Sequence, residues 1–412
     1  MSPSTITLIF LAFAIISFVL EKIPLGLTAT IVAIGLNLTG VLTTSETFAG
    51  YVNSNVILCV GMFVVGQALF ETGMANKIGS LVTRFAKSER LLIVAVMTIV
   101  GTMSGFLSNT GTAAVLIPVV CGIADESGYS RSRLLMPLVF AAALGGNLSI
   151  IGAPGNLIGT NALNELGIET SFFEYIGVGL PMLIFGIVYF SLFGYKLLPD
   201  NKNLSTLEDD QFTSKEFSNV PQWKQIASLV ILIVSIIAMI FEKQIGVKLH
   251  VSASVGAIIL ILTGVISEKQ ALRSIDLKTV FLFGGSLALA SALETTGAGP
   301  LIADTIIHVL GDNPSPFVLL LVIWLVTCVL TNFMSNTATT ALMVPIAVAL
   351  AQGVGADPRA VVVATVIAGS CAYATPIGMP ANTMVVSIGG YSFKDYIKAG
   401  LPLIGVSFVI CM

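Results

Sequence analysis

The chain has 412 residues, of which 55% are hydrophobic and only 10% are charged, and its formal net charge at pH 7 is −3. A soluble protein of this size could not bury so much apolar surface, so the composition excludes an ordinary soluble domain and favours a polytopic helical membrane protein. The net charge itself carries little information, because the placement of the charges matters more than their sum, and no nucleic-acid partner is expected. The five cysteines are scattered singly, without metal or disulfide spacing.

Apolar runs of helix length predict ten membrane spans. They lie at roughly 5–20, 25–42, 54–73, 133–151, 173–197, 225–241, 251–266, 279–296, 359–377 and 396–412. Residues 75–88 and 298–312 are expected to form two helices on the membrane surface. The first run, 5–20, lacks the basic flank of a cleavable signal peptide. The last run, 396–412, is shorter than the corresponding run of the first half, 173–197, as if cut short.

Two further apolar stretches, 90–124 and 317–351, are each interrupted by a short polar sequence. The first contains SGFLSNTGTAAVLIP and the second TNFMSNTATTALMVP. A polar tip between two apolar arms is typical of a re-entrant hairpin, because non-helical backbone at that depth must line a cavity or be buried in protein. The alternative is that Asn and Thr merely cap a helix beginning at Gly111 or Ala338. Two copies in matching contexts favour the hairpins.

The two halves of the chain match well beyond these tips. For example, Glu21-Lys22 recurs as Glu242-Lys243, and 171–183 recurs as 392–403. Each half carries five spans and one hairpin. Because five is odd, the second half must enter the membrane upside down. The predicted fold is therefore an all-α polytopic membrane protein of two inverted repeats, with ten spans, two re-entrant hairpins and broken helices at the midplane, as in secondary transporters.

The positions of the basic residues predict the orientation. If the N-terminus lies outside, sixteen of the nineteen Lys and Arg residues face the cytoplasm, and only Lys243, Lys248 and Arg359 face out. Such a bias follows the positive-inside rule. Both termini are therefore expected outside a multi-pass protein of the inner (cytoplasmic) membrane.

A Gly-x-Pro-x-Asn sequence follows each hairpin, within 151–156 and 377–382. Gly and Pro break a helix, and Asn suits the start of the next one. A simple kink is the alternative, but the pairing across the repeats favours two unwound segments. Hairpin tips and unwound segments together offer oxygen ligands for a small hard cation and helix N-termini for an anion.

At bilayer depth the predicted segments contain no Lys, Arg, Asp, Glu or His. An anionic substrate would then be neutralised by helix dipoles and co-bound cations rather than by fixed charge. Proton coupling normally needs a buried carboxylate or histidine, and His250 and His308 fall in predicted loops. Coupling to Na⁺ fits better.

With both tips and both broken segments in place, the sequence resembles the divalent anion/sodium symporter family (solute carrier family 13 in vertebrates) over essentially its whole length. The resemblance implies a homodimer in which a scaffold holds a transport domain that moves as an elevator, carrying dicarboxylate, citrate or sulfate with sodium. On this basis, we expect scaffold parts at 1–74 and 222–297, arm helices at 75–88 and 298–312, transport parts at 89–198 and 313–412, and a cytoplasmic linker at 199–221. The family's extra N-terminal span is not expected, in agreement with the N-terminus assigned to the outside.

The same resemblance assigns the binding residues by position. The first sodium site would use Ser104, Ser108, Asn109 and the loop at Gly152, and the second Thr331, the Met334 carbonyl, Asn336 and the loop at Gly378. The substrate carboxylates would be held by Asn109, Thr110, Asn336 and Thr337, beside Ala153, Met379 and Pro380. The family's loops usually read Gly-Thr-Pro-Pro-Asn. Ala153 and Met379 replace a threonine that reaches the substrate in the family, which leaves the identity of the substrate open.

The leading hypothesis is a sodium-coupled symporter of small carboxylates of the C4-dicarboxylate type. An organic-anion exchanger or a carrier of an inorganic oxyanion such as sulfate remains open on the same fold. An anion channel is the alternative from another class. A membrane-embedded enzyme is the least favoured reading, since the spans contain no catalytic pair or cluster of metal ligands.

Overall fold

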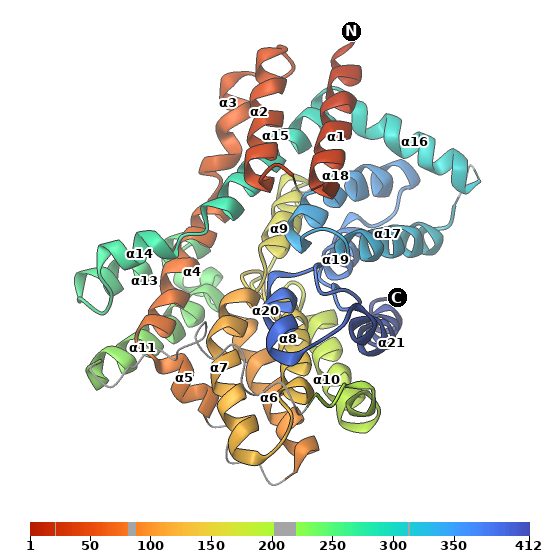
Figure 1. Cartoon of the computed structure of the whole chain (residues 1–412). Coiled ribbons are helices and arrows are strands. Elements are labelled where there is room, and N and C mark those ends of the chain that lie inside the picture. The colour runs from red at the N-terminus through yellow and green to blue at the C-terminus, as the bar shows by residue number, and fades with distance from the viewer. Residues whose placement is uncertain (21, 81–87, 202–219, 312–313) are drawn as a thin grey trace.

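The computed structural model describes residues 1–20, 22–80, 88–201, 220–311 and 314–412, and all regular secondary structure in these ranges is helical (Figure 1). With η marking short 3₁₀ helices, the elements are α1 (Pro3–Leu20), α2 (Leu25–Leu38), α3 (Thr44–Ala49), η1 (Gly50–Val52), α4 (Ser54–Glu71), α5 (Met74–Gly79), α6 (Glu89–Ser104), α7 (Asn109–Ser127), α8 (Arg131–Gly145), η3 (Gly146–Leu148), α9 (Pro154–Glu165), α10 (Ile176–Leu192), η4 (Gly194–Leu197), α11 (Gln222–Ile240), α12 (Glu242–Ile245), α13 (Leu249–Leu262), α14 (Glu268–Ser274), α15 (Leu277–Thr295), α16 (Ala298–Leu310), α17 (Pro316–Thr331), α18 (Asn336–Val354), α19 (Pro358–Gly369), α20 (Pro380–Gly389) and α21 (Phe393–Cys411).

Six helical stretches in the described ranges are long and apolar enough to cross a membrane. Five of them are the helices α1, α7, α11, α15 and α18. The sixth is the stretch Thr44–Glu71, which includes α4. Helices also occupy the other predicted spans, but several are shorter than predicted. Helix α19, for example, has 12 residues and a length of about 18 Å. The second limbs of the predicted hairpins, α7 and α18, are among the six, so their length alone does not separate a re-entrant limb from a complete span.

The duplicated sequence produces duplicated local structure. The sequence Leu-Thr-Gly-Val ends both α2 and α13, and its glycines, Gly40 and Gly264, have φ angles of 76° and 70°. This left-handed conformation strains residues with a Cβ atom, so glycine stops both helices at the same point. The predicted spans 25–42 and 251–266 therefore end earlier than expected, at Leu38 and Leu262.

Helices from the two halves pack against each other along their lengths. Helix α2 lies along α15 and α4 lies along α13. A Cβ atom on Gly285 of α15 would come within 2.6 Å of the Ala29 backbone, and one on Gly61 of α4 within 2.8 Å of Ala253. The halves therefore approach closely where small residues face each other. The apolar core of α1, α2 and α15 also includes Met334 and the first turns of α18.

The predicted surface helices are described in part. For 75–88 the structure gives α5, Met74–Gly79, and residues 81–87 lie outside the described residues. For 298–312 the structure gives α16, which extends away from the bundle of α1, α2 and α15 in Figure 1; its place at the membrane surface stays a prediction. His250 lies in α13 rather than in a predicted loop, and His308 lies in α16, within the stretch 298–312, which is predicted to be helical. Most of the predicted linker, 202–219, also lies outside the described residues.

Candidate functional site

The two Ser-Asn-Thr sequences form matching tips between pairs of helices. Helix α6 ends at Ser104 and α7 begins at Asn109, while the backbone N–H of Gly111 donates to the Ser108 hydroxyl over 3.1 Å. In the second copy, the N–H of Ala338 donates to the Ser335 hydroxyl over 3.2 Å. Serine is therefore the capping residue in both copies. The alternative in which Asn and Thr cap helices beginning at Gly111 and Ala338 is wrong, because both helices begin at the Asn.

A buried hydroxyl joins each tip to the end of a neighbouring helix. In the first repeat, the Ser104 hydroxyl lies 2.7 Å from Asn109 Oδ1 and 2.6 Å from the carbonyl oxygen of Ala142 in α8. In the second, the Thr331 hydroxyl lies 2.8 Å from Asn336 Oδ1 and also contacts the carbonyl oxygen of Gly369 in α19. The three pairs of equivalent residues share one sequence offset, so the same polar cluster has been built twice.

The first cluster gathers three oxygen atoms around one end of the Asn109 amide. One terminal atom of the Asn109 amide lies 2.7 Å from Ser104 Oγ, 3.0 Å from the Ala142 carbonyl and 3.1 Å from the Gly152 carbonyl. If that atom is nitrogen, its two protons and the Ser104 hydroxyl proton together satisfy the three oxygens. If it is oxygen, four oxygens converge with a single hydroxyl proton between them, an arrangement that a small hard cation would relieve.

Several predicted sodium ligands therefore come together, and two backbone carbonyls that the sequence did not predict lie beside them. Ser104, Asn109 and Gly152 share one cluster, and Thr331 and Asn336 share the other. The backbone of Gly378 packs against that of Thr331, since a Cβ atom on Gly378 would lie 2.8 Å from the Thr331 carbonyl. The Ser108 hydroxyl is engaged in capping, and the Met334 side chain is buried. The carbonyls of Ala142 and Gly369 were missed because both fall inside predicted spans.

The predicted spans 133–151 and 359–377 are wrong at their C-terminal ends. Helix α8 ends at Gly145 and α19 at Gly369, and the chain unwinds before the Gly-x-Pro-x-Asn sequences are reached. Ala153 and Met379 are the residues immediately before α9 and α20. The Pro-x-Asn part of each predicted unwound loop therefore belongs to the next helix, with Pro in the first turn, where it sacrifices no hydrogen bond.

The asparagine of each sequence holds the unwound segment in place. Asn156 Nδ2 donates to the carbonyls of Gly146 and Ser149, over 2.8 and 2.7 Å. Asn382 Nδ2 donates to the corresponding carbonyls of Ala372 and Thr375, over 2.7 and 3.0 Å. Both asparagines are fully buried. The unwinding thus begins early because a side chain several residues further on supplies the hydrogen bonds that helix geometry would otherwise provide.

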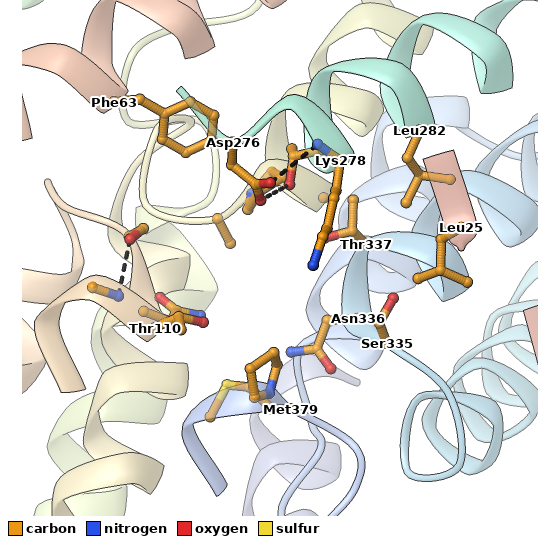
Figure 2. A pocket seen from close by; sticks show the side chains of 18 of the residues that line it. Leu25, Phe63, Thr110, Asp276, Lys278, Leu282, Ser335, Asn336, Thr337 and Met379 are labelled. Carbon is orange, nitrogen blue, oxygen red and sulfur yellow. Dashed lines mark hydrogen bonds between the residues drawn. The ribbon is translucent and has the colours of Figure 1, made fainter. Parts of the chain in front are cut away.

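A cavity of about 1040 Å³ lies between the tips, the starts of α9 and α20, and the helices α2, α4 and α15 (Figure 2). Its wall includes all seven residues predicted to bind the substrate, namely Asn109, Thr110, Ala153, Asn336, Thr337, Met379 and Pro380. Asn109, Ala153 and Met379 are each less than 10% exposed, so they present only a small surface to the cavity. Polar tips thus line one side, and apolar side chains such as Leu25, Phe63 and Leu282 line another.

Three charged residues in the same wall were missed by the sequence reasoning. Lys22 precedes α2, and Asp276 and Lys278 lie at the start of α15. The sequence placed them in solvent-facing connections at the ends of predicted spans. Figure 2 shows the Lys278 side chain extending from α15 into the cavity toward Thr337 and Asn336. The cavity therefore contains fixed charge that the predicted spans lack.

Comparisons with known proteins agree with this architecture. The family model of the citrate transporters (CitMHS) matches residues 15–368. An uncharacterised transporter of Haemophilus influenzae is 26% identical, with 98% of this chain and 89% of the relative covered. A sodium-dependent dicarboxylate transporter (SdcS) of Staphylococcus saprophyticus is 25% identical, with 95% of this chain and 82% of the relative covered.

A likeness in fold extends to a solved transporter structure. The crystal structure of the Alcanivorax borkumensis YdaH transporter superimposes with a TM-score of 0.66 at 14% identity, covering 98% of this chain and 96% of that one. At this identity the likeness concerns the fold alone. The family match covers most of the chain and agrees with the relationship expected from the paired motifs. The chain therefore belongs to the citrate transporter family and is a polytopic membrane transporter, not an enzyme.

Proposed function

We propose that this protein is a sodium-coupled symporter of small carboxylates, of the dicarboxylate type, in the inner membrane. The observation that carries the proposal is the duplicated oxygen cluster behind the two hairpin tips. Each cluster joins a buried hydroxyl, an Asn side chain and carbonyls at the end of a broken helix, and these are the ligands that suit Na⁺. The name of the SdcS relatives, sodium-dependent dicarboxylate transporters, supports the same coupling ion and substrate class.

The position of the cavity supports an elevator mechanism. Its polar side is made by the predicted transport parts, through the tips and the starts of α9 and α20. Its other side is made by α2, α4 and α15 of the predicted scaffold parts. Substrate and Na⁺ held by the tips would then be carried past the scaffold as one body, in a homodimer whose scaffolds are in contact.

The contacts between connecting segments support the sidedness of the proposed topology, in which each hairpin returns the chain to the face from which it entered. Lys243 pairs with Glu169, and Arg359 with Glu174, all on the predicted outer side. Arg133 pairs with Glu89 on the predicted cytoplasmic side. Each pair joins segments that the proposed topology places on one face, as a membrane between the two faces requires.

The test is uptake of labelled succinate, citrate, acetate and sulfate into proteoliposomes, with and without an inward Na⁺ gradient. We expect saturable uptake of a carboxylate that is driven by Na⁺ and lost when choline replaces Na⁺. Asn109→Ala and Asn336→Ala should each abolish uptake while the protein still inserts in the bilayer, because each removes a cation ligand and an anion donor from a shielded site. Uptake indifferent to Na⁺, or a conductance that does not saturate, would refute the symporter and favour the exchanger or the channel.

A further inference from the structure

Lys278 is a scaffold residue whose charged end faces the hairpin tips. It lies in the first turn of α15, and Figure 2 shows its side chain directed into the cavity toward Thr337 and Asn336. Among the described residues no carboxylate forms an ion pair with its ammonium group. An ammonium that meets no carboxylate in such a cavity is available to an anion that enters it.

The nearby acid does not neutralise this lysine. One Asp276 oxygen accepts the backbone N–H of Lys278 over 3.1 Å, and the other accepts the Thr279 hydroxyl over 2.6 Å. The carboxylate therefore caps α15, while the Lys278 side chain turns away from it (Figure 2). Lys22 lines the same cavity, so two positive charges and one negative charge line the wall, all on the scaffold side.

The tips and the lysine offer two different kinds of anion site. The tips supply amides, hydroxyls and the N-termini of α7 and α18, which suit one carboxylate without fixed charge. A second anionic group on the same molecule would extend across the cavity toward the scaffold. We propose that Lys278, reinforced by Lys22, binds the distal carboxylate and so makes the carrier select doubly charged substrates over singly charged ones. This inference rests on the proposed function and specifies its substrate class.

The placement on the scaffold has a second consequence. If the tips move past the scaffold with the substrate, the distal carboxylate leaves Lys278 behind during the movement. The lysine then strengthens binding only while the tips lie opposite the scaffold as they do in this structure. It adds nothing once the tips have carried the substrate to the other side of the membrane. A residue of the transport part would strengthen binding on both sides.

The first experiment compares binding of succinate and butyrate, which match in carbon number and differ in one carboxylate. Isothermal titration of the purified full-length protein in Na⁺ would use wild type, Lys278→Gln, Lys278→Arg and the control Lys269→Gln. The control removes an equally exposed lysine from the same connection, outside the cavity wall. We expect Lys278→Gln to weaken succinate binding roughly 5- to 30-fold, the range between an exposed ion pair and a charged hydrogen bond, and butyrate binding less than about 2-fold. Lys278→Arg should retain most of the affinity.

A second measurement separates this role from a structural one. KM for succinate would be measured from each side of the membrane, in vesicles of opposite orientation. Lys278→Gln should raise KM on the side to which the cavity opens and leave it within about 2-fold on the other, whereas general misfolding would affect both sides. If wild type binds carboxylates but Lys278→Gln and Lys269→Gln bind succinate and butyrate equally well, Lys278 does not bind the distal carboxylate. The proposed function would then stand. If wild type binds no carboxylate with or without Na⁺, both are wrong.

Discussion

Ser104 and Thr331 each connect the Asn side chain of a tip to a carbonyl oxygen of a helix that ends nearby. The Thr331 hydroxyl has one proton and two oxygen neighbours, and it can donate to only one of them at a time. In the first repeat, an Asn109 amide with its nitrogen turned inward satisfies Ser104 and the carbonyls of Ala142 and Gly152. A bound cation would take the place of these protons, with the amide oxygens turned toward it, and this is the role we propose for the two clusters.

Removing either hydroxyl should therefore weaken sodium coupling more than it weakens folding. For Ser104→Ala and Thr331→Val we expect the Na⁺ concentration for half-maximal uptake to rise about 5- to 10-fold, since a single polar ligand in a shielded site contributes about 1 kcal/mol. The control is Thr98→Val. The Thr98 hydroxyl donates within α6 to the Val94 carbonyl, on an exposed face. Equal sodium dependence in all three variants would place the cation elsewhere.

In the proposed site, Ala153 and Met379 would set how many hydrogen-bond donors reach the substrate. They occupy equivalent positions just before α9 and α20, in extended backbone with φ of −142° and −146°, which a β-branched residue accepts easily. Ala153→Thr with Met379→Thr should strengthen succinate binding about 5-fold or more relative to acetate, because two neutral hydrogen bonds become possible at about 0.5–1.5 kcal/mol each. The matched control, Ala153→Val with Met379→Val, adds the same shape without the hydroxyls. If both double variants leave the preference for succinate over acetate unchanged, these positions do not touch the substrate.

At the scale of elements, Asn156 and Asn382 keep the broken helices open. Each donates two hydrogen bonds from one amide to two carbonyls of the unwound segment before it. Replacing either by Ala removes two buried hydrogen bonds to backbone carbonyls, which costs roughly 2–5 kcal/mol. The apparent Tm of the purified protein should fall by several degrees. Asn→Asp should be as damaging, because a carboxylate cannot donate. Asn164→Ala, an exposed residue of α9, serves as the control and should leave Tm unchanged.

These same asparagines explain what the sequence could and could not predict. The tips were predictable because Ser-Asn-Thr between apolar runs is a local pattern, and it occurs twice. The start of the unwound segments could not be predicted in this way, because the amide that replaces the helical hydrogen bonds comes from a residue about ten positions later. Lys278 was missed for a related reason. Its position in a short connection is local information, but the direction of its side chain depends on how α2 packs along α15.

For the whole molecule, the proposed topology places both termini outside. The charge distribution favours this orientation, and the ion pairs join only segments assigned to one face. We expect a cysteine at Ser2 to react with a membrane-impermeant maleimide in intact cells, and a cysteine at Lys269, which is exposed in α14, to react only after the cells are opened. Of the native cysteines, Cys121 and Cys411 are half-buried and the other three are buried, so replacing these two by serine lowers the background. Protection of Ser2→Cys in intact cells, with labelling of Lys269→Cys, would invert the topology. Lys22 and Lys278, which the proposed topology assigns to the cytoplasmic face, would then lie on the outer face.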